Sequence, residues 1–316
     1  MGPPSTNEPR SEMPADPSVP QHPSGWQSYD SVADAYADVV TLRNLVMTRD
    51  LVALVAPRFG GSVLDVGAGA GAAAQAALGA TGPAGVVVAV DPSLRLVRRV
   101  EPRQGIAVAV AVAAALPLLN ETFDAVIANL VLNHVPDYQA ALAEMAAVLR
   151  RGGRLGVTAW GVLGDAPPVD AHDEEAAAQA WIETAARYAP REAVDAAARE
   201  ALPWEDWFAD PAHLRVGLEE AGLHQVELTG RAYRSLTSHR EWLSSVNTGA
   251  NARYLHEAIG PTAWDSFCRE TLLRLREVVP EPFERVAQML FAVGTRPRHR
   301  RASAPIETVG GRPPGG

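Results

Sequence analysis

The sequence predicts an α/β protein built on a doubly wound, seven-stranded and mostly parallel sheet with helical cap insertions. Short apolar runs of strand character alternate with segments of helical spacing, which is the pattern of parallel strands joined by crossover helices. A glycine-rich turn at 67–71 follows the first apolar run, and two long helical segments, 165–208 and 235–285, interrupt the later part. In a doubly wound sheet such insertions overhang the carboxyl ends of the strands, where ligands bind.

The elements follow from apolar periodicity and from the residues that start and stop helices. Asp137 caps one helix, which we expect Gly152 and Gly153 to end, and Pro57 lies near the end of the first helix. The expected helices are 32–58, 137–150 and 211–221, and the expected strands are 62–66, 85–90, 106–111, 125–130, 154–160, 225–229 and 288–294.

Composition narrows the class of protein. The chain has 316 residues, and its 28 Lys and Arg against 37 Asp and Glu give a net charge of −9, which argues against a nucleic-acid substrate. Cys268 is alone, so an intramolecular disulfide is excluded, and the histidines show no metal-ligand spacing. The first residues lack an apolar signal core, and the apolar run 106–119 is too short for a bilayer span, so we expect a cytoplasmic protein without membrane segments.

The turn after the first strand is the most informative segment. Gly67, Gly69 and Gly71 allow a sharp backbone turn whose amides can approach a ligand closely. Dinucleotide-binding folds have a similar Gly-x-Gly-x-x-Gly/Ala turn, but Asp65 ends the preceding strand. A carboxylate there repels a pyrophosphate and attracts an ammonium group. This favours the amino-acid tail of S-adenosylmethionine over NAD.

An acidic residue also ends the second strand. Asp91 follows the run 86–90 directly, where a carboxylate can accept hydrogen bonds from both ribose hydroxyls of an adenosine nucleoside. The alternative is that Asp91 caps the helix that begins at Pro92 and Ser93, and the two roles are compatible.

Several ordered motifs together resemble one family. They are Val-Leu-Asp-Val-Gly-Ala-Gly-Ala-Gly at 63–71, the acidic strand end at 86–91, Ala-Ala-Leu-Pro-Leu at 114–118 with Phe-Asp-Ala-Val at 123–126, Leu-Asn-His-Val-Pro-Asp at 132–137 and Tyr-Asp-Ser-Val-Ala-Asp-Ala-Tyr at 29–36. Over about residues 26–160 the chain resembles class I S-adenosylmethionine-dependent methyltransferases of the type 11, ubiquinone/menaquinone-methyltransferase-like branch. The resemblance implies a Rossmann-like methyltransferase fold.

Four regions are expected on this basis. Residues 1–24 form a disordered N-terminal arm, 25–160 the S-adenosylmethionine-binding core, 161–295 the substrate cap with the C-terminal part of the sheet, and 296–316 a disordered, basic, Pro/Gly-rich tail.

The residues and the resemblance together predict a set of cofactor contacts. The predicted cofactor-binding residues are Tyr29, Tyr36, Asp65, Gly67, Ala68, Gly69, Asp91, Pro92, Ala113, Ala114 and Asn129. One position departs from the family pattern, because Val112 stands where the branch usually has an aspartate that holds the adenine amino group. We therefore expect backbone groups around Ala113 and Ala114, with apolar packing, to hold the adenine.

Candidates for catalysis are few. His134 lies just past the fourth strand and is the best-placed general base for an oxygen or carbon acceptor, with a structural role in orienting its loop as the favoured alternative. His239 and Glu241 form a weaker candidate pair in the cap.

The cap is where substrate identity is expected. Six of the seven tryptophans lie at or after Trp160, and ordinary helix packing explains most of them. One or two are expected to touch the substrate, and the segment 204–208 is the expected lid.

The predicted function is transfer of a methyl group from S-adenosylmethionine to a small, partly apolar metabolite, without metal, nucleic acid or membrane partners. The alternatives are a catalytically silent methyltransferase-like binding module and an NAD(P)-dependent oxidoreductase. The acceptor atom (O, N or C), the identity of any general base and the oligomeric state are open at this level.

Overall fold

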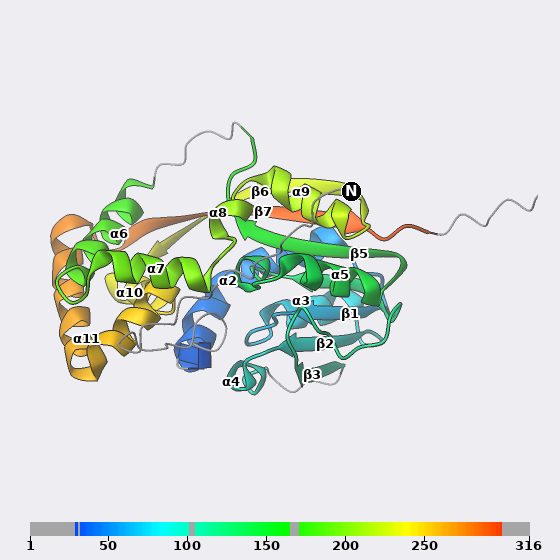
Figure 1. Cartoon of the computed structure of the whole chain (residues 1–316), viewed down its shortest axis with the longest axis horizontal. Coiled ribbons are helices and arrows are strands. Elements are labelled where there is room, and N and C mark those ends of the chain that lie inside the picture. Colours follow the sequence, from blue (N-terminus) through cyan, green and yellow to red (C-terminus); the bar gives the residue numbers. More distant parts are fainter. Residues whose placement is uncertain (1–28, 31, 101–104, 165–170, 299–316) are drawn as a thin grey trace, which may run out of the picture.

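A computed structural model describes residues 29–30, 32–100, 105–164 and 171–298 (Figure 1). The predicted disordered arm 1–24 and residues 299–316 of the predicted disordered tail 296–316 lie outside these residues. Within them, a seven-stranded sheet has the order β3-β2-β1-β4-β5-β7-β6. The strands are β1 Ser62–Val66, β2 Val86–Asp91, β3 Ile106–Val110, β4 Phe123–Ala128, β5 Leu149–Trp160, β6 His224–Thr237 and β7 Phe283–Thr295. All neighbouring strands are parallel except at β7, which runs antiparallel to β5 and β6. The predicted doubly wound sheet is confirmed.

Helices cover both faces of the sheet. The helical segments are α1 Ala33–Ala35, η2 Tyr36–Val40, α2 Thr41–Val55, α3 Ala72–Thr81, α4 Leu94–Val97, η3 Leu132–His134, α5 Tyr138–Val148, α6 His172–Ala185, α7 Arg191–Ala201, α8 Glu205–Phe208, α9 Pro211–Glu220, α10 His239–Val246 and α11 Ala250–Val278. Successive residues of β1 point to opposite faces: Val63 packs with residues of α2 and α3, and Leu64 packs with residues of α5 and α9. Burial on both faces explains why these strands are continuous apolar runs.

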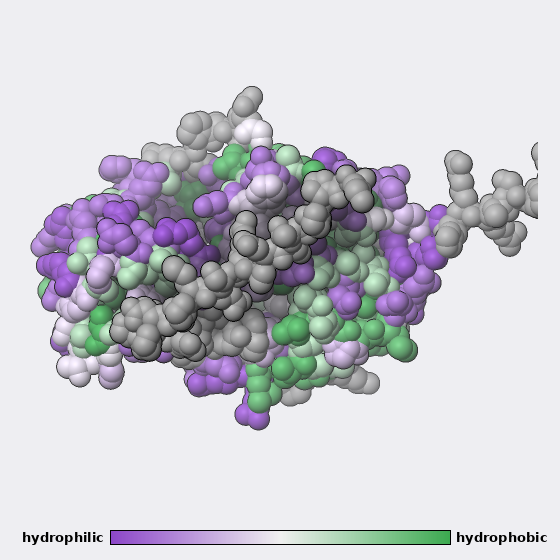
Figure 2. All heavy atoms as spheres, viewed as in Figure 1, coloured by the Kyte–Doolittle hydropathy of each residue, from purple (hydrophilic) through white to green (hydrophobic). Residues whose placement is uncertain are grey.

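The cap is carried by a two-stranded extension of the sheet. Pairing of β5 with β7 ends at Trp160 and Met289, whereas β6 and β7 remain paired as far as Thr237 and Phe283. The expected strands 225–229 and 288–294 were therefore too short. Helices α6, α7, α10 and α11 lie around this extension (Figure 1), with Trp181, Trp242 and Phe267 in their common core. Hydrophilic residues dominate the visible surface of the cap (Figure 2).

Two boundaries differ from the sequence prediction. Helix α5 ends at Val148, and Gly152 and Gly153 lie within β5, where the register against β4 shifts. A Cβ on Gly153 would lie 2.8 Å from the Arg150 carbonyl oxygen, so this irregular strand segment needs glycine. Arg296, predicted to be in a solvated tail, donates hydrogen bonds to the carbonyl oxygens of Ala147 and Leu149, because β7 keeps it beside the sheet.

The described residues include no helix that is both long and apolar enough to cross a membrane.

An ion-pair cluster at the amino end of β4 yields a stability prediction. The Asp124 carboxylate accepts hydrogen bonds from the Ser62 amide at 2.8 Å and from Arg150 Nη1 at 2.9 Å, and it pairs with Arg58. Burial raises the pKa of this carboxyl, but the hydrogen bonds from Arg58, Ser62 and Arg150 outweigh burial and lower the pKa to about 2. A lowered folded-state pKa stabilises the protein above the unfolded value of about 3.9 and loses that effect as pH falls toward 2.

We expect Asp124→Asn to lower the free energy of unfolding by about 1 to 2 kcal/mol at pH 7, because the arginine partners are largely exposed and screened. The difference from wild type should shrink between pH 5 and pH 3 in urea unfolding experiments. Asp195→Asn, which breaks an exposed pair with Arg191, is the control and should change stability little. If the difference in the free energy of unfolding between wild type and Asp124→Asn did not depend on pH, this assignment would be contradicted.

Candidate functional site

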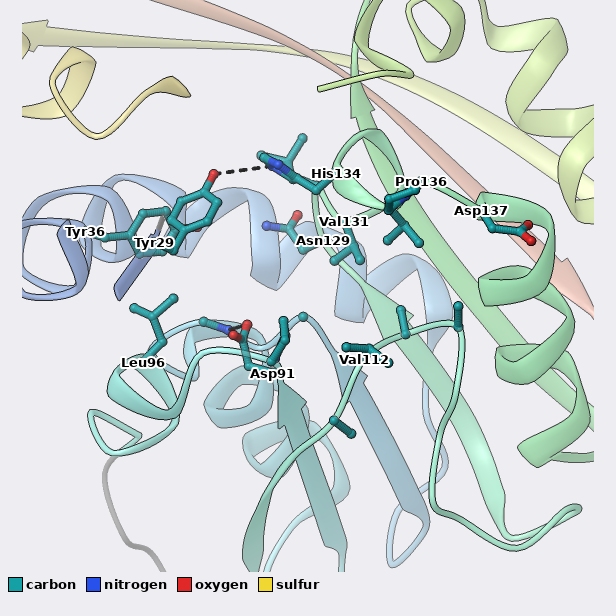
Figure 3. Close-up of a pocket in the computed structure, with 18 residues that line it drawn as sticks. Tyr29, Tyr36, Asp91, Leu96, Val112, Asn129, Val131, His134, Pro136 and Asp137 are labelled. Atoms are coloured by element: carbon teal, nitrogen blue, oxygen red, sulfur yellow. Dashed lines mark hydrogen bonds between the residues drawn. The ribbon is translucent and has the colours of Figure 1, made fainter. Parts of the chain in front are cut away.

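A cavity of about 360 Å³ lies at the carboxyl ends of β1, β2 and β4 (Figure 3). The structure brings the predicted site residues together there, with two exceptions: Asp65 and Ala68 do not line the cavity. Those that do are Tyr29, Tyr36, Gly67, Gly69, Asp91, Pro92, Ala113, Ala114, Asn129 and His134. The cavity forms at this edge because parallel strands end together and their loops diverge from it.

The glycine turn forms the floor of the cavity. Gly69 has a φ of +54°, and its amide donates a 2.9 Å hydrogen bond to Asp91 Oδ2. A Cβ on Gly69 would lie 3.3 Å from the Tyr36 ring. Both the backbone conformation and the close approach of Tyr36 therefore favour glycine here.

Asp91 connects the two turns that border the cavity. Its Oδ1 accepts a 2.9 Å hydrogen bond from the Ser93 amide, while Oδ2 accepts the bond from Gly69. The helix-capping role considered for Asp91 belongs instead to Ser93, whose side chain accepts from the Leu96 amide at the start of α4. Burial raises the pKa of Asp91, although the Ser93 and Gly69 amides oppose this.

Asp65 lies beneath the turn and is 1% exposed. Neither of its carboxylate oxygens has a hydrogen-bond partner among the described residues. Burial raises the pKa of Asp65 to about 8. The nearby Ala74 amide opposes this without meeting hydrogen-bond geometry, and the charge of Asp91 raises the pKa by a smaller amount. The carboxyl is therefore neutral at pH 7 and gains its charge only if a cation approaches.

Tyr29 and His134 form the wall opposite Asp91 (Figure 3). The Tyr29 hydroxyl oxygen lies 3.4 Å from His134 Nε2. Burial, with the positive charge of Arg253 as the second cause, lowers the pKa of His134 to about 4. His134 is thus neutral at physiological pH, and an effective general base needs a pKa nearer to the working pH. Its role as a base stays a prediction, with any acid limb in the rate now expected near pH 4.

Three residues near this wall were missed as site residues by the sequence analysis. Arg253 of α11 packs on Tyr29, and Asn133 donates a hydrogen bond to Glu205 of α8. Two of them had a usable signal: Glu205 belongs to the predicted lid segment, and Asn133 belongs to the motif at 132–137. Arg253 occurs in no recognisable motif.

The weaker candidate pair for catalysis, His239 and Glu241, lies outside the cavity. Glu241 forms a capping box with Ser238 at the start of α10, and His239 Nε2 faces the carbonyl oxygens of Val279 and Pro280. Both side chains therefore have structural partners.

The tryptophans of the described chain do not line the cavity. Trp204 packs on Tyr138, and Trp207 is exposed and stacks on His213. The expected contact of one or two tryptophans with the substrate stays a prediction.

Val112 is half-exposed in the cavity wall, next to Ala113 and Ala114. Backbone recognition of adenine stays a prediction.

Comparison with known proteins assigns the family. A family model described as a methyltransferase domain matches residues 64–157, which carry β1 through most of β5. Over 208 residues the chain is 30% identical to a ubiquinone biosynthesis O-methyltransferase of Parvibaculum lavamentivorans, covering 61% of this chain and 70% of that protein. The chain belongs to the class I S-adenosylmethionine-dependent methyltransferase family.

Other matches are partial or distant. An uncharacterized protein of Mycobacterium bovis is 37% identical to this chain over 103 residues. The match covers 31% of this chain and 36% of the relative. The chain thus spans about a third of the length of such relatives. Among solved structures, the [4+2]-cyclase SpnF aligns with a TM-score of 0.52 at 17% identity, covering 86% of this chain and 95% of that one. At this identity the likeness concerns the fold alone.

Proposed function

We propose that the chain is an S-adenosylmethionine-dependent methyltransferase that acts on a small, partly apolar metabolite. The observation that carries the proposal is a pair of buried carboxyls on either side of one glycine turn. Asp65 lies beneath the turn without a hydrogen-bond partner among the described residues, and Asp91 lies in the cavity wall. Two carboxyls suit an ammonium group and a ribose diol, and they disfavour the pyrophosphate of NAD.

The residues that line the cavity, with Asp65 beneath the glycine turn, fit this cofactor. Asp65 would hold the ammonium group through a charge-assisted hydrogen bond, and Asp91 would accept from the ribose hydroxyls. Apolar side chains dominate the rest of the wall and suit an adenine ring that lacks a carboxylate partner: Leu96, Val112, Leu130, Val131 and Val135. The bound cofactor would supply an activated methyl group on a sulfonium, so that the protein must mainly align an acceptor and exclude water.

Cofactor binding and acceptor recognition are assigned to different parts of the fold. We propose that residues 25–160 bind the cofactor and that 161–295 supply acceptor recognition, with α8 next to the cavity loop as the lid. An oxygen acceptor is suggested by the relative whose name is ubiquinone biosynthesis O-methyltransferase. The single cysteine and the net charge of −9 support a cytoplasmic setting and a substrate other than nucleic acid.

Calorimetric titration tests the cofactor. We expect S-adenosylhomocysteine to bind and NAD not to bind. Because the pKa of Asp65 is about 8 without ligand, a cationic ammonium should ionise it and release close to one proton at pH 7. The measured enthalpy should then differ between phosphate and Tris buffers. Asp65→Asn should remove this difference and weaken binding; equal proton release by wild type and Asp65→Asn would refute the role of Asp65.

Turnover separates an enzyme from a silent binding module. Labelled S-adenosylmethionine should be tested with catechol, benzoate and phenethylamine as oxygen and nitrogen acceptors, and with a naphthoquinol as an oxygen or carbon acceptor. Tight binding of S-adenosylhomocysteine without transfer to any acceptor would favour the binding module.

A further inference from the structure

The helical cap contacts the cavity wall at two separate points. Both contacts hold the polar pair formed by Tyr29 and His134, whose facing oxygen and nitrogen atoms are 3.4 Å apart. The two side chains belong to segments far apart in sequence, and both line the cavity across from Asp91 (Figure 3). Their relative position therefore depends on tertiary contacts.

The first contact comes from α11. Arg253 lies in the first turn of this helix and is 5% exposed. Its guanidinium carbon lies 4.1 Å from the centre of the Tyr29 ring, and its Nη1 donates to the Thr248 carbonyl oxygen. A buried guanidinium stacked on an aromatic ring fixes the plane of that ring, because the attraction depends on the cation lying over the ring face.

The second contact comes from α8 and the residue before it. The Asn133 amide nitrogen donates to the Glu205 carboxylate, and the Trp204 indole nitrogen donates to the Pro136 carbonyl oxygen at 3.1 Å. Asn133 is 5% exposed and precedes His134 directly. These two bonds fasten the segment 132–136 at both ends, with His134 between them.

Burial and, after it, the nearby charges determine the protonation of the pair. Arg253 of α11 is the cation, and Glu205 of α8 and Asp91 of β2 are the acidic groups whose charges act on Tyr29. Arg253 also acts on His134, while the Ala201 carbonyl opposes it weakly. The imidazole is therefore neutral at pH 7, and the Tyr29 oxygen retains a lone pair that can accept a hydrogen bond.

We propose that Arg253 and Glu205 are positioning residues for methyl transfer: Arg253 fixes the Tyr29 ring and Glu205 fixes the His134 segment, so that the two form a neutral hydrogen-bonding pair for an acceptor that carries an O–H or N–H group. This rests on the proposed methyltransferase function. A neutral pair in this position orients the acceptor by accepting its hydrogen bond. It selects protic nucleophiles over carboxylates, which cannot donate.

Histidine NMR tests the proposed role of Arg253, on the full chain with S-adenosylhomocysteine bound. With 13C-labelled imidazoles, His134→Gln identifies the His134 signal among the eight histidines. The wild-type signal should not shift between pH 8 and pH 5. In Arg253→Met its pKa should rise above that of wild type but stay below about 6.5, because burial, the larger cause of the lowered pKa, remains. In Arg253→Lys, which keeps the charge, the pKa should stay near wild type. Arg274→Met, on the exposed side of the same helix, is the matched control.

Hydrogen–deuterium exchange tests the proposed role of Glu205. Peptides that cover 132–136 should exchange at least tenfold faster in Glu205→Ala, and Glu205→Gln should restore protection because its amide oxygen can still accept from Asn133. Asp206→Ala is the matched control, since that side chain is exposed and adjacent in sequence. With any hydroxyl or amine acceptor that turns over, kcat should fall at least tenfold in Arg253→Met and in Glu205→Ala. In Glu205→Ala, which acts on the His134 segment and not on Tyr29, the KM for S-adenosylmethionine should be unchanged.

The outcomes separate this proposal from the proposed function. Absence of S-adenosylhomocysteine binding to wild type would overturn the function itself. Normal binding with an unshifted His134 titration in Arg253→Met, or with unchanged exchange in Glu205→Ala, would overturn the positioning role. Preferential methylation of benzoate over catechol and phenethylamine would overturn the acceptor class.

Discussion

Replacing Asp91 with alanine should lower the affinity for S-adenosylhomocysteine about 100-fold or more. The substitution removes the proposed acceptor of two ribose hydrogen bonds, and bonds to a charged acceptor contribute about 1.5 to 3 kcal/mol each. It also removes the carboxylate that accepts hydrogen bonds from the Gly69 and Ser93 amides, so that the turn loses its cross-link as well. Calorimetry measures the loss, and circular dichroism checks that the fold persists.

Two further variants make this result interpretable. Asp91→Asn keeps one oxygen for the turn amides but loses the charge, and its affinity should lie between those of wild type and the alanine variant. Asp38→Ala removes an exposed carboxylate that pairs with Arg99, and its affinity should equal that of wild type. A folded Asp91→Ala protein that binds S-adenosylhomocysteine as tightly as wild type would remove Asp91 from the site.

Replacing Gly69 with valine should abolish detectable cofactor binding. The residue has a φ of +54°, a region that β-branched residues avoid. Its new Cβ would lie 3.3 Å from the Tyr36 ring, in the wall of the cavity, and the two methyl groups would extend further. A loss of 1,000-fold or more is expected in the same calorimetric titration, about 4 kcal/mol.

Gly164→Val is the matched control for backbone strain. Gly164 has a φ of +64°, and a Cβ there meets nothing within 4 Å. This variant should lose some stability and keep its affinity for S-adenosylhomocysteine. If Gly69→Val retained wild-type affinity, the turn would have only a structural role.

Local sequence information was sufficient for the cofactor half of the protein. Strands β1 to β4 and helix α5 lie within a few residues of their expected positions, because apolar runs, glycine turns and the Asp137 cap are local signals. The carboxyl ends of parallel strands meet at one edge, so residues that follow those strands converge without further information. This is why Gly67, Gly69 and Asp91 could be expected to share a site.

Strand length and boundaries needed the pairing partner. Nothing in residues 230–237 indicates a strand until β7 is known to lie beside them over the same length. The glycine pair 152–153 reads as a helix stop by local rules, but it is the register of β5 against β4 that gives it a place within a strand.

The amino-acid sequence by itself determined the fold class, the glycine turn and the two acidic strand ends, because each depends on residues adjacent in the chain. Only the tertiary structure decided the environment of those groups. Burial raises the pKa of Asp65 to about 8 and, with Arg253, lowers that of His134 to about 4, and burial is a property of the packed molecule. Arg253 reaches Tyr29 from a helix of the cap that the β6–β7 extension carries, and Glu205 reaches Asn133 from α8, which packs on β5 and α9; no short sequence pattern encodes either arrangement.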